Sequence, residues 1–247
     1  MRGDVTVFSA GLVVPMTAPP ILRGAVAVAD GRILHVGERR WVIDSLEQQD
    51  VPYLEHWWDG ALLPGLVNAH SHLQYTGMAE VGAGRYSGFD DWADAFTVVY
   101  ERPHDWRADA LLGADELIRH GVTAVADIVT DREASDVLHV AGLRGIAFWE
   151  VMNWETAEWN ERGREQVIAD LEGIPSTPGA GLSPHAPYSL DTVPLLDMPD
   201  IVRQRGQRLH IHLGESAFEE ERLDTEGGET HRAWHFVGVQ SFRALRS

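Results

Sequence analysis

The stretch ALLPGLVNAHSHL, residues 61–73, decides the fold predicted for this chain. After Pro64-Gly65, a short apolar run has the composition of a buried strand, and it ends in His70 and His72. Residues two apart on a strand point to the same face, so both imidazoles can reach one metal ion. We therefore expect His70 and His72 to bind a metal at the carboxyl end of a strand.

Downstream of this stretch, apolar strand-like segments alternate with helical ones. Strands are expected at residues 62–68, 122–128, 145–151, 181–184 and 209–213, and helices at residues 106–120, 131–143, 157–171 and 192–205. Gly121, Gly145 and Gly206 follow these helices closely, as glycines at helix C-termini do. The alternation is typical of a parallel sheet covered by helices.

The length of this region limits how much of a barrel it can form. An eight-unit barrel needs about 250 residues, whereas residues 62–247 suffice for five or six βα units. We therefore expect the fold class α/β, as an incomplete (β/α)8 TIM-barrel type. Because an open barrel leaves two strand edges exposed, the chain is interpreted as a fragment.

The N-terminal segment, residues 1–61, is expected to form a small antiparallel β unit of the β-sandwich type. Residues 24–29 and 33–36 are β-rich, and Asp30-Gly31 between them is a strong hairpin signal. Residues 41–60 are interpreted as a short helix and a connector. Residues 1–15 are interpreted as a strand and not as a signal peptide.

The composition excludes several kinds of function. The formal net charge of −18 argues against general binding of nucleic acid or anionic membranes. Without cysteine, the chain has no disulfide, thiolate metal site or cysteine nucleophile. All 20 basic residues are arginine, so Schiff-base chemistry and a lysine bridging two metals are excluded too.

The partners that remain are small molecules. No apolar run of 18 residues is present, so no membrane span is expected. We expect a cytoplasmic protein that acts on a small-molecule substrate and that can form a homo-oligomer.

The motif at Pro64, Gly65, Asn68, His70 and His72 resembles the first barrel strand of the amidohydrolase superfamily. Further segments resemble that superfamily in the same order, namely GVTAVADI (121–128), LSPHAPYSL (182–190) and HIHLGES (210–216). The second of these is similar to the fourth-strand loop of the deaminase and chlorohydrolase branch.

This resemblance implies roles for residues in the last two segments. His212 is expected to be the third metal ligand, Glu215 the proton shuttle, and His185 a residue that faces the substrate. His210 is not a ligand in the family pattern, and we expect a hydrogen-bonded strand histidine there. The alternative for Glu215 is an acid at a helix N-terminus, and for His185 a turn histidine between prolines.

The chemistry of these side chains fits one divalent ion. Neutral imidazoles suit Zn²⁺ or Fe²⁺, and such an ion lowers the pKa of water from 15.7 towards about 7. Glu215 could then transfer a proton to a leaving amine, while His185 polarises the reacting group. The resemblance, together with the absence of lysine, favours a single ion over the two-metal branch that uses a carboxylated lysine.

Two residues are candidates for binding the substrate. Trp92, in GFDDWADAF (88–96), could cover a flat ring, and Glu150, in GIAFWEVMNW (145–154), follows the pattern of a strand end facing the pocket. The second run resembles the third strand of adenosine-type and aminodeoxyfutalosine deaminases, where a Glu can hold a ribose hydroxyl. The alternatives are a core tryptophan and a surface glutamate.

The family also takes a His from its sixth strand and an Asp from its eighth, and no segment here matches either. His231 and His235 lie four apart in a helical pattern, and residues 242–247 are interpreted as a helix. The predicted function is hydrolysis of a C–N bond, as in deamination of a purine-like nucleoside or heterocycle. The alternatives are a truncated, inactive fragment of such an enzyme and a metal-independent binding module.

Overall fold

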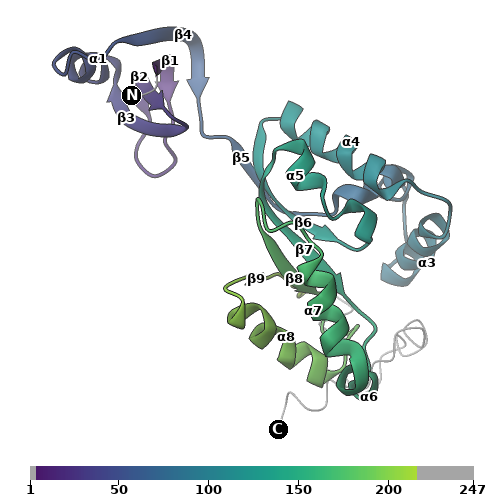
Figure 1. The fold of residues 1–247 in the computed structure, drawn as a ribbon. Coiled ribbons are helices and arrows are strands. Elements are labelled where there is room, and N and C mark those ends of the chain that lie inside the picture. Colours follow the sequence, from purple (N-terminus) through teal and green to yellow (C-terminus); the bar gives the residue numbers. More distant parts are fainter. Residues whose placement is uncertain (1–3, 216–247) are drawn as a thin grey trace. The chain divides into compact units, whose positions relative to one another are not determined.

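The computed structural model describes residues 4–215 of the chain. The chain divides into two compact units, Met1–Gly65 and Leu66–Ser247. Within the described residues, no helix combines the length and the apolar character that crossing a bilayer requires. Figure 1 labels the helices and strands of each unit and colours them along the sequence.

The first unit is a four-stranded sheet with one helix packed against it. Its elements are β1 (Val5–Val13), β2 (Ile21–Ala29), β3 (Arg32–Glu38), α1 (Arg39–Glu47) and β4 (Tyr53–Leu62). The strand order is β3-β2-β1-β4. Alternate residues of β1 and β2, including Val7 and Ala27, pack with Val42 and Leu46 of α1 to form the core.

The hairpin between β2 and β3 forms where it was predicted. Asp30 and Gly31 have φ angles of 49° and 69°, the pair of positive values that a type I′ turn requires. The expectation of a purely antiparallel unit is wrong, however, because β4 pairs parallel to β1. Residues 53–60, which were expected to belong to the connector, form this strand together with Ala61 and Leu62. The helix α1 packs against the sheet, and the described residues of this unit form no second sheet.

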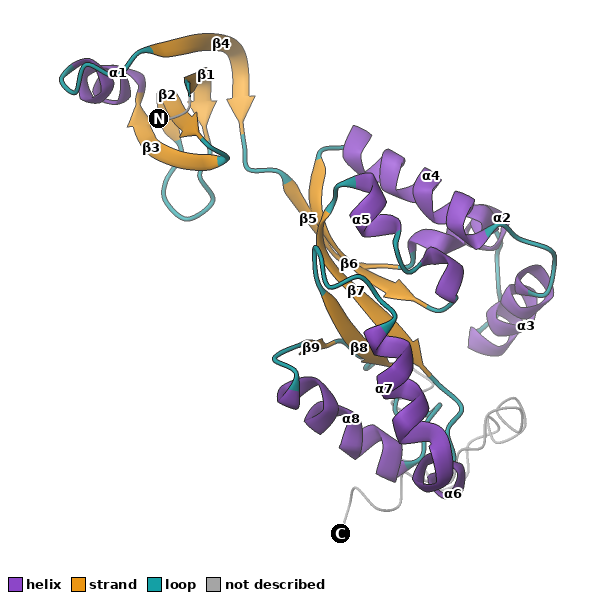
Figure 2. Cartoon of the chain, viewed as in Figure 1, coloured by secondary structure: helices purple, strands orange, loops and turns teal. Residues whose placement is uncertain are grey.

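The second unit contains a five-stranded parallel sheet whose spatial order, β5-β6-β7-β8-β9, follows the chain. The strands are β5 (Leu66–Ser71), β6 (Val122–Val129), β7 (Arg144–Val151), β8 (Ala180–Pro184) and β9 (Arg208–Leu209). The described residues thus form an open sheet with β5 and β9 at its edges. The alternation of strands and helices predicted from the sequence is confirmed (Figure 2).

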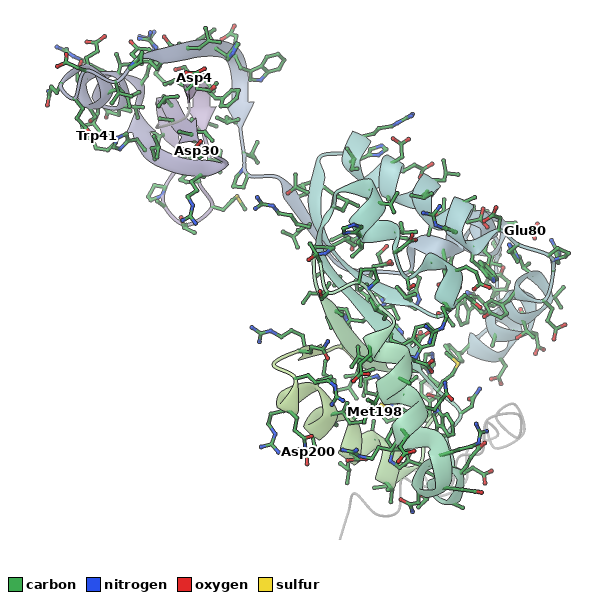
Figure 3. The ribbon with its side chains drawn as sticks, in the orientation of Figure 1. Asp4, Asp30, Trp41, Glu80, Met198 and Asp200 are labelled. Carbon is green, nitrogen blue, oxygen red and sulfur yellow. The ribbon has the colours of Figure 1, made fainter. Side chains whose placement is uncertain are left out.

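Helices and short turns connect these strands. They are η1 (Leu73–Met78), α2 (Ala79–Gly82), α3 (Phe89–Tyr100), α4 (Trp106–Arg119), η2 (Arg132–Ala134), α5 (Val137–Ala141), α6 (Thr156–Glu158), the π-helical η3 (Trp159–Gly163), α7 (Arg164–Glu172) and α8 (Thr192–Gln204). Buried residues of α4 and α5 pack on β6 and β7. Those of α7 and α8 pack on β7 and β8, with Met198 of α8 fully buried (Figure 3).

Two strand boundaries differ from the sequence prediction. Leu62 ends β4, and β5 begins only at Leu66 because Pro64-Gly65 separates the two strands. As a result His70 lies inside β5, whereas His72 follows it. β9 is shorter than expected, but its pairing with β8 continues, since the backbone N–H of His212 donates to His185 O at 2.9 Å.

Candidate metal centre

Three histidines from the two edges of the parallel sheet come together. His70 and His72 come from the end of β5, and His212 follows β9. Their ring centroids lie 5.4 Å (70–72), 4.7 Å (70–212) and 5.3 Å (72–212) apart. One nitrogen from each imidazole lies within 4.8 Å of the others, so the three could hold one ion.

This convergence requires a strongly curved sheet. β5 and β9 are four strand spacings apart, which corresponds to roughly 19 Å in a flat sheet. Side chains stand perpendicular to a flat sheet and could not close that distance, yet the rings of His70 and His212 are 4.7 Å apart. The sheet therefore curls towards its carboxyl ends, as the wall of a barrel does.

The electrostatics of His70 and His72 favour their neutral form. The pKa of His72 is lowered to about 4, mainly by burial; Glu150 opposes this shift, and the neighbouring histidines add to it. Burial and the proximity of His212 and His210 also lower the pKa of His70. Neutral imidazoles keep a lone pair for a metal, so His70 and His72 are suited to bind a cation.

Glu150, at the end of β7, is buried beside the histidines. Its Oε2 accepts a hydrogen bond from Thr130 Oγ1 at 2.6 Å, and its Oε1 lies 3.4 Å from His212 Nε2. Since the Thr130 proton points to Glu150, Tyr75 donates to Thr130 Oγ1 at 2.9 Å. Burial alone would raise the pKa of Glu150, but the hydrogen bond from His212 and the nearby histidines outweigh it and lower the value to about 2.

His185 follows β8 and lies on the same side of the sheet. Its ring packs edge-on against His212, with centroids 5.1 Å apart. Ser189 donates its proton to Ala186 O, so its Oγ accepts from His185 Nδ1 at 2.8 Å. Glu150, His185 and His212 also place one ligand atom each within 4.8 Å of one another. The predicted residues from three strands therefore share one cluster.

Glu215 lies three residues beyond His212, at the last described position of the chain. Tyr188 is only 1% exposed, and its hydroxyl donates a hydrogen bond to Glu215 Oε2 at 2.5 Å. The carboxylate is also near enough to His70 to oppose the lowering of that histidine's pKa. Glu215 is thus held beside the histidine cluster by a side chain from the loop after β8.

His210 has the hydrogen bond predicted for it. Its Nε2 lies 3.0 Å from Nδ1 of His70, and the two ring centroids are 5.0 Å apart. The backbone N–H of His210 donates to Leu182 O at 3.0 Å. The ring also packs edge-on against buried Phe148, with centroids 5.1 Å apart.

Trp92 lies in an aromatic cluster near the histidines. On α3, its ring packs against Phe89 and Phe96, with centroids 5.3 and 5.4 Å away. Phe96 contacts Tyr75, and Tyr75 stacks on His72 with centroids 4.9 Å apart. Trp92 is thus linked to His72 through two further rings. Its contacts among the described residues fit both a packing role and the predicted role of covering a flat ring.

Sequence reasoning missed three polar side chains around the cluster. Tyr75 and Thr130 carry no motif, and only the fold brings them to Glu150. Tyr188 stands within the quoted segment LSPHAPYSL, where a tyrosine three residues after His185 was the available signal. His231, His235 and the expected helix at residues 242–247 lie outside the described residues.

The sequence matches one known protein family and several curated proteins. A sequence model of the amidohydrolase family matches residues 61–246. The 5-methylthioadenosine/S-adenosylhomocysteine deaminase of Desulfovibrio desulfuricans is 29% identical over 229 residues, which cover 89% of this chain and 51% of that protein. The chain spans about half the length of the curated relatives that it matches.

Solved structures agree on the fold. The aminofutalosine deaminase of Helicobacter pylori, in complex with methylthio-coformycin, matches with a TM-score of 0.77 and 18% identity, over 96% of this chain and 59% of that one. An adenosine deaminase from Xanthomonas campestris with bound zinc matches with a TM-score of 0.67 and 22% identity, over 96% and 55%. At these identities the likeness shows an α/β fold of the TIM-barrel type. Because the family match covers most of the sequence, the chain belongs to the amidohydrolase family.

Proposed function

We propose that this protein is a metal-dependent aminohydrolase that removes an amino group from a purine-like nucleoside or a related heterocycle. The observation that carries the proposal is the convergence of His70, His72 and His212 from opposite edges of the sheet. Three imidazoles at strand carboxyl ends are a usual ligand set for a catalytic metal. Relatives named as deaminases support the choice of reaction within the family.

The residues of the site suit a single divalent ion. Nδ1 of His72 is a buried polar atom with no hydrogen-bond partner among the described residues, and such an atom is costly unless something binds it or its ring. Imidazole donors suit zinc or iron, and the zinc in the Xanthomonas campestris structure favours zinc. His70, His72 and His212 would hold the ion, which when bound acts as a Lewis acid on water.

Glu215 is the residue proposed to transfer the proton from water to the leaving amine. A carboxylate beside the ligands can accept a proton from the attacking water and return it to the departing amine, so that ammonia leaves and a carbonyl remains. The hydrogen bond from Tyr188 to Oε2 holds the Glu215 carboxylate beside the proposed ligands. His185, oriented by Ser189, would polarise the group under attack.

Trp92 and Glu150 are proposed as substrate contacts. The aromatic cluster on α3, which includes Trp92, could cover a flat purine ring. Glu150 could accept a hydrogen bond from a ribose hydroxyl, although the side chain is buried and Thr130 already occupies one of its oxygens. The class of substrate follows the adenine nucleosides in the names of the relatives.

We also propose that the five parallel strands are part of a (β/α)8 barrel. The curvature of the sheet and the single chain-order run of strands support this reading. Residues 62–247 would then be the partial hydrolase barrel, and residues 1–61 a separate β unit.

Metal analysis tests the proposal directly. The purified protein is loaded with zinc, dialysed and analysed for metal, together with His70→Ala and His212→Ala. We expect about one zinc per wild-type chain and strong loss of metal in both variants, because each removes one of three ligands. His35→Ala, in β3, removes a histidine from the other unit and is the matched control.

Deamination is tested on the same samples. Release of ammonia from adenosine, 5-methylthioadenosine and S-adenosylhomocysteine is measured with zinc present. Full metal occupancy in both ligand variants would overturn the metal assignment, and zinc binding without release of ammonia from any of these would overturn the substrate class.

A further inference from the structure

The pair formed by His210 and His70 has a consequence for the metal centre. In a pair of neutral imidazoles joined by one hydrogen bond, one ring donates and the other accepts. The contact joins Nδ1 of His70 to Nε2 of His210 at 3.0 Å. The proton between them therefore belongs to one ring or the other, and its location decides which nitrogen of His70 can bind a metal.

Only one of the two arrangements leaves His70 able to act as a ligand. If His210 donates, Nδ1 of His70 accepts, its proton sits on Nε2, and neither nitrogen is free for a metal. If His70 donates through Nδ1–H, its Nε2 keeps a lone pair. An outer partner that accepts the second N–H is the usual way to fix the tautomer of a ligating histidine.

The position of His210 is set by the sheet rather than by His70. Its backbone N–H donates to Leu182 O on β8, and its ring packs on Phe148 of β7, which is 4% exposed. His210 and His212 are two residues apart in a strand-like segment, so both rings face the metal centre. His210 thus holds its Nε2, a possible hydrogen-bond acceptor, in a fixed position next to His70. The His70 side chain itself is exposed.

We propose that His210 is a positioning residue, whose Nε2 accepts the Nδ1 proton of His70 and so directs Nε2 of His70 to the metal. The proposal rests on the proposed metal site and adds to it an outer partner for one ligand. It predicts that a hydrogen-bond acceptor is needed at the position of His210 Nε2, and that nothing else about the imidazole is needed.

Amide substitutions separate this role from packing. The side-chain oxygen of Gln can occupy the position of Nε2, whereas the side-chain oxygen of Asn reaches only the position of Nδ1. His210→Gln and His210→Asn therefore carry the same chemical group at two distances from His70. His210→Leu removes the acceptor and keeps apolar contact with Phe148.

The readout is the dissociation constant for zinc, measured by competition with a chromophoric chelator. Loss of an outer partner typically costs 10–100-fold in metal affinity, and we expect a loss of about this size for His210→Leu and His210→Asn. His210→Gln should recover most of it. In the zinc-loaded protein, ¹⁵N NMR should show a protonated Nδ1 at His70 and an unprotonated Nε2 at His210.

The outcomes distinguish this inference from the proposed metal site. If His210→Leu and His210→Asn bind zinc as tightly as wild type while His70→Ala does not, His210 has no positioning role and the metal site stands. Equal losses in the Gln and Asn variants would also overturn the inference, because they indicate a packing effect. If wild-type protein binds no zinc, the metal site fails and the inference fails with it. Far-UV circular dichroism confirms that each variant is folded.

Discussion

Asp127 is a buried carboxyl group near the histidine cluster whose protonation makes stability depend on pH. It lies near the end of β6, is 2% exposed, and its Oδ1 accepts the backbone N–H of Leu73 at 2.9 Å. Leu73 directly follows His72, so this hydrogen bond fixes the backbone where the chain leaves the site. Burial raises the pKa of Asp127 to about 7, and the hydrogen bond from Leu73 offsets only part of that.

The raised pKa predicts a loss of stability as pH increases. The unfolded chain releases this proton near pH 3.8, whereas the folded protein retains it until about pH 7. The contribution of Asp127 is therefore complete below about pH 4 and is lost as the pH rises through 7. Asp127→Asn keeps an acceptor for Leu73 and does not titrate, so its stability relative to wild type should rise across this range.

The expected gain is up to about 4 kcal/mol, from a shift of about three pKa units. Urea unfolding at pH 4.5 and pH 8, with a chelator present, measures the difference between variant and wild type at each pH. Using that difference removes the contributions of the other carboxylates. A difference that does not change between the two pH values would contradict the prediction.

Glu215 carries the prediction about catalysis. Glu215→Gln keeps the size of the side chain and an oxygen that can accept from Tyr188, but removes the base. We expect zinc content to be unchanged and the rate of deamination to fall by about 10²–10⁴-fold, the usual contribution of general acid–base catalysis. Glu161→Gln, in η3, is a control for the loss of one charge. Near-normal turnover in Glu215→Gln would exclude it as the proton carrier.

At the scale of elements, local signals in the sequence predicted turns better than they predicted strand ends. Gly121 and Gly206, predicted to follow helices, have φ angles of 79° and 64° after α4 and α8. Gly145 was expected to do the same and is instead the second residue of β7. The helix before it ends earlier, and Gly142 caps α5 with a φ of 69°.

Gly145 is constrained by the neighbouring strand. Its φ is 133°, and a Cβ atom there would lie 1.8 Å from the backbone oxygen of Val125 in β6. We expect Gly145→Ala to destabilise the protein by about 2–6 kcal/mol, because backbone strain and overpacking each cost about 1–3 kcal/mol.

Denaturant unfolding checks this prediction, and Gly82→Ala is its control. Gly82 lies in α2, where an added Cβ meets nothing within 4 Å, so its substitution should be neutral or slightly stabilising. Equal stabilities for the two variants would show that β6 and β7 do not approach each other as closely as described.

The order and type of the main elements were readable from the sequence because periodicity and glycine placement are local properties. The polar chain from Tyr75 through Thr130 to Glu150 was not, because its members are 55 and 20 residues apart and share no motif. The same holds for α3, for which the sequence predicted no helix and offered only Trp92 as a candidate to cover a flat ring. Contacts between elements depend on packing, which no single segment encodes.

At the scale of the whole molecule, the proposed metal ligands come together only because the parallel sheet is curved. The family resemblance predicted that His70, His72 and His212 share one ion, but no local pattern in the sequence shows how histidines from β5 and β9 meet. That meeting depends on the twist accumulated over β6, β7 and β8, which arises from every strand pair. A bound ion would therefore join the first and last strands of the sheet and oppose its opening.

This connection predicts where zinc stabilises the protein. A ligand that binds only the folded state, at 100 times its dissociation constant, adds about 2.7 kcal/mol of stability. We expect amide exchange to slow by up to about 100-fold in β5 and β9, whose ends carry the ligands, on addition of zinc. The strands β1–β4 belong to the other compact unit and contain none of the proposed ligands, so they provide the internal reference.

Hydrogen-exchange mass spectrometry with and without zinc measures this pattern, and His212→Ala should abolish it because the link to β9 is lost. Equal protection of β1–β4 and β5–β9 would indicate general stabilisation instead of a specific connection. Protection at β5 alone would mean that His70 and His72 bind the ion without His212. Only protection at both edges, lost together in His212→Ala, fits an ion that closes the curved sheet.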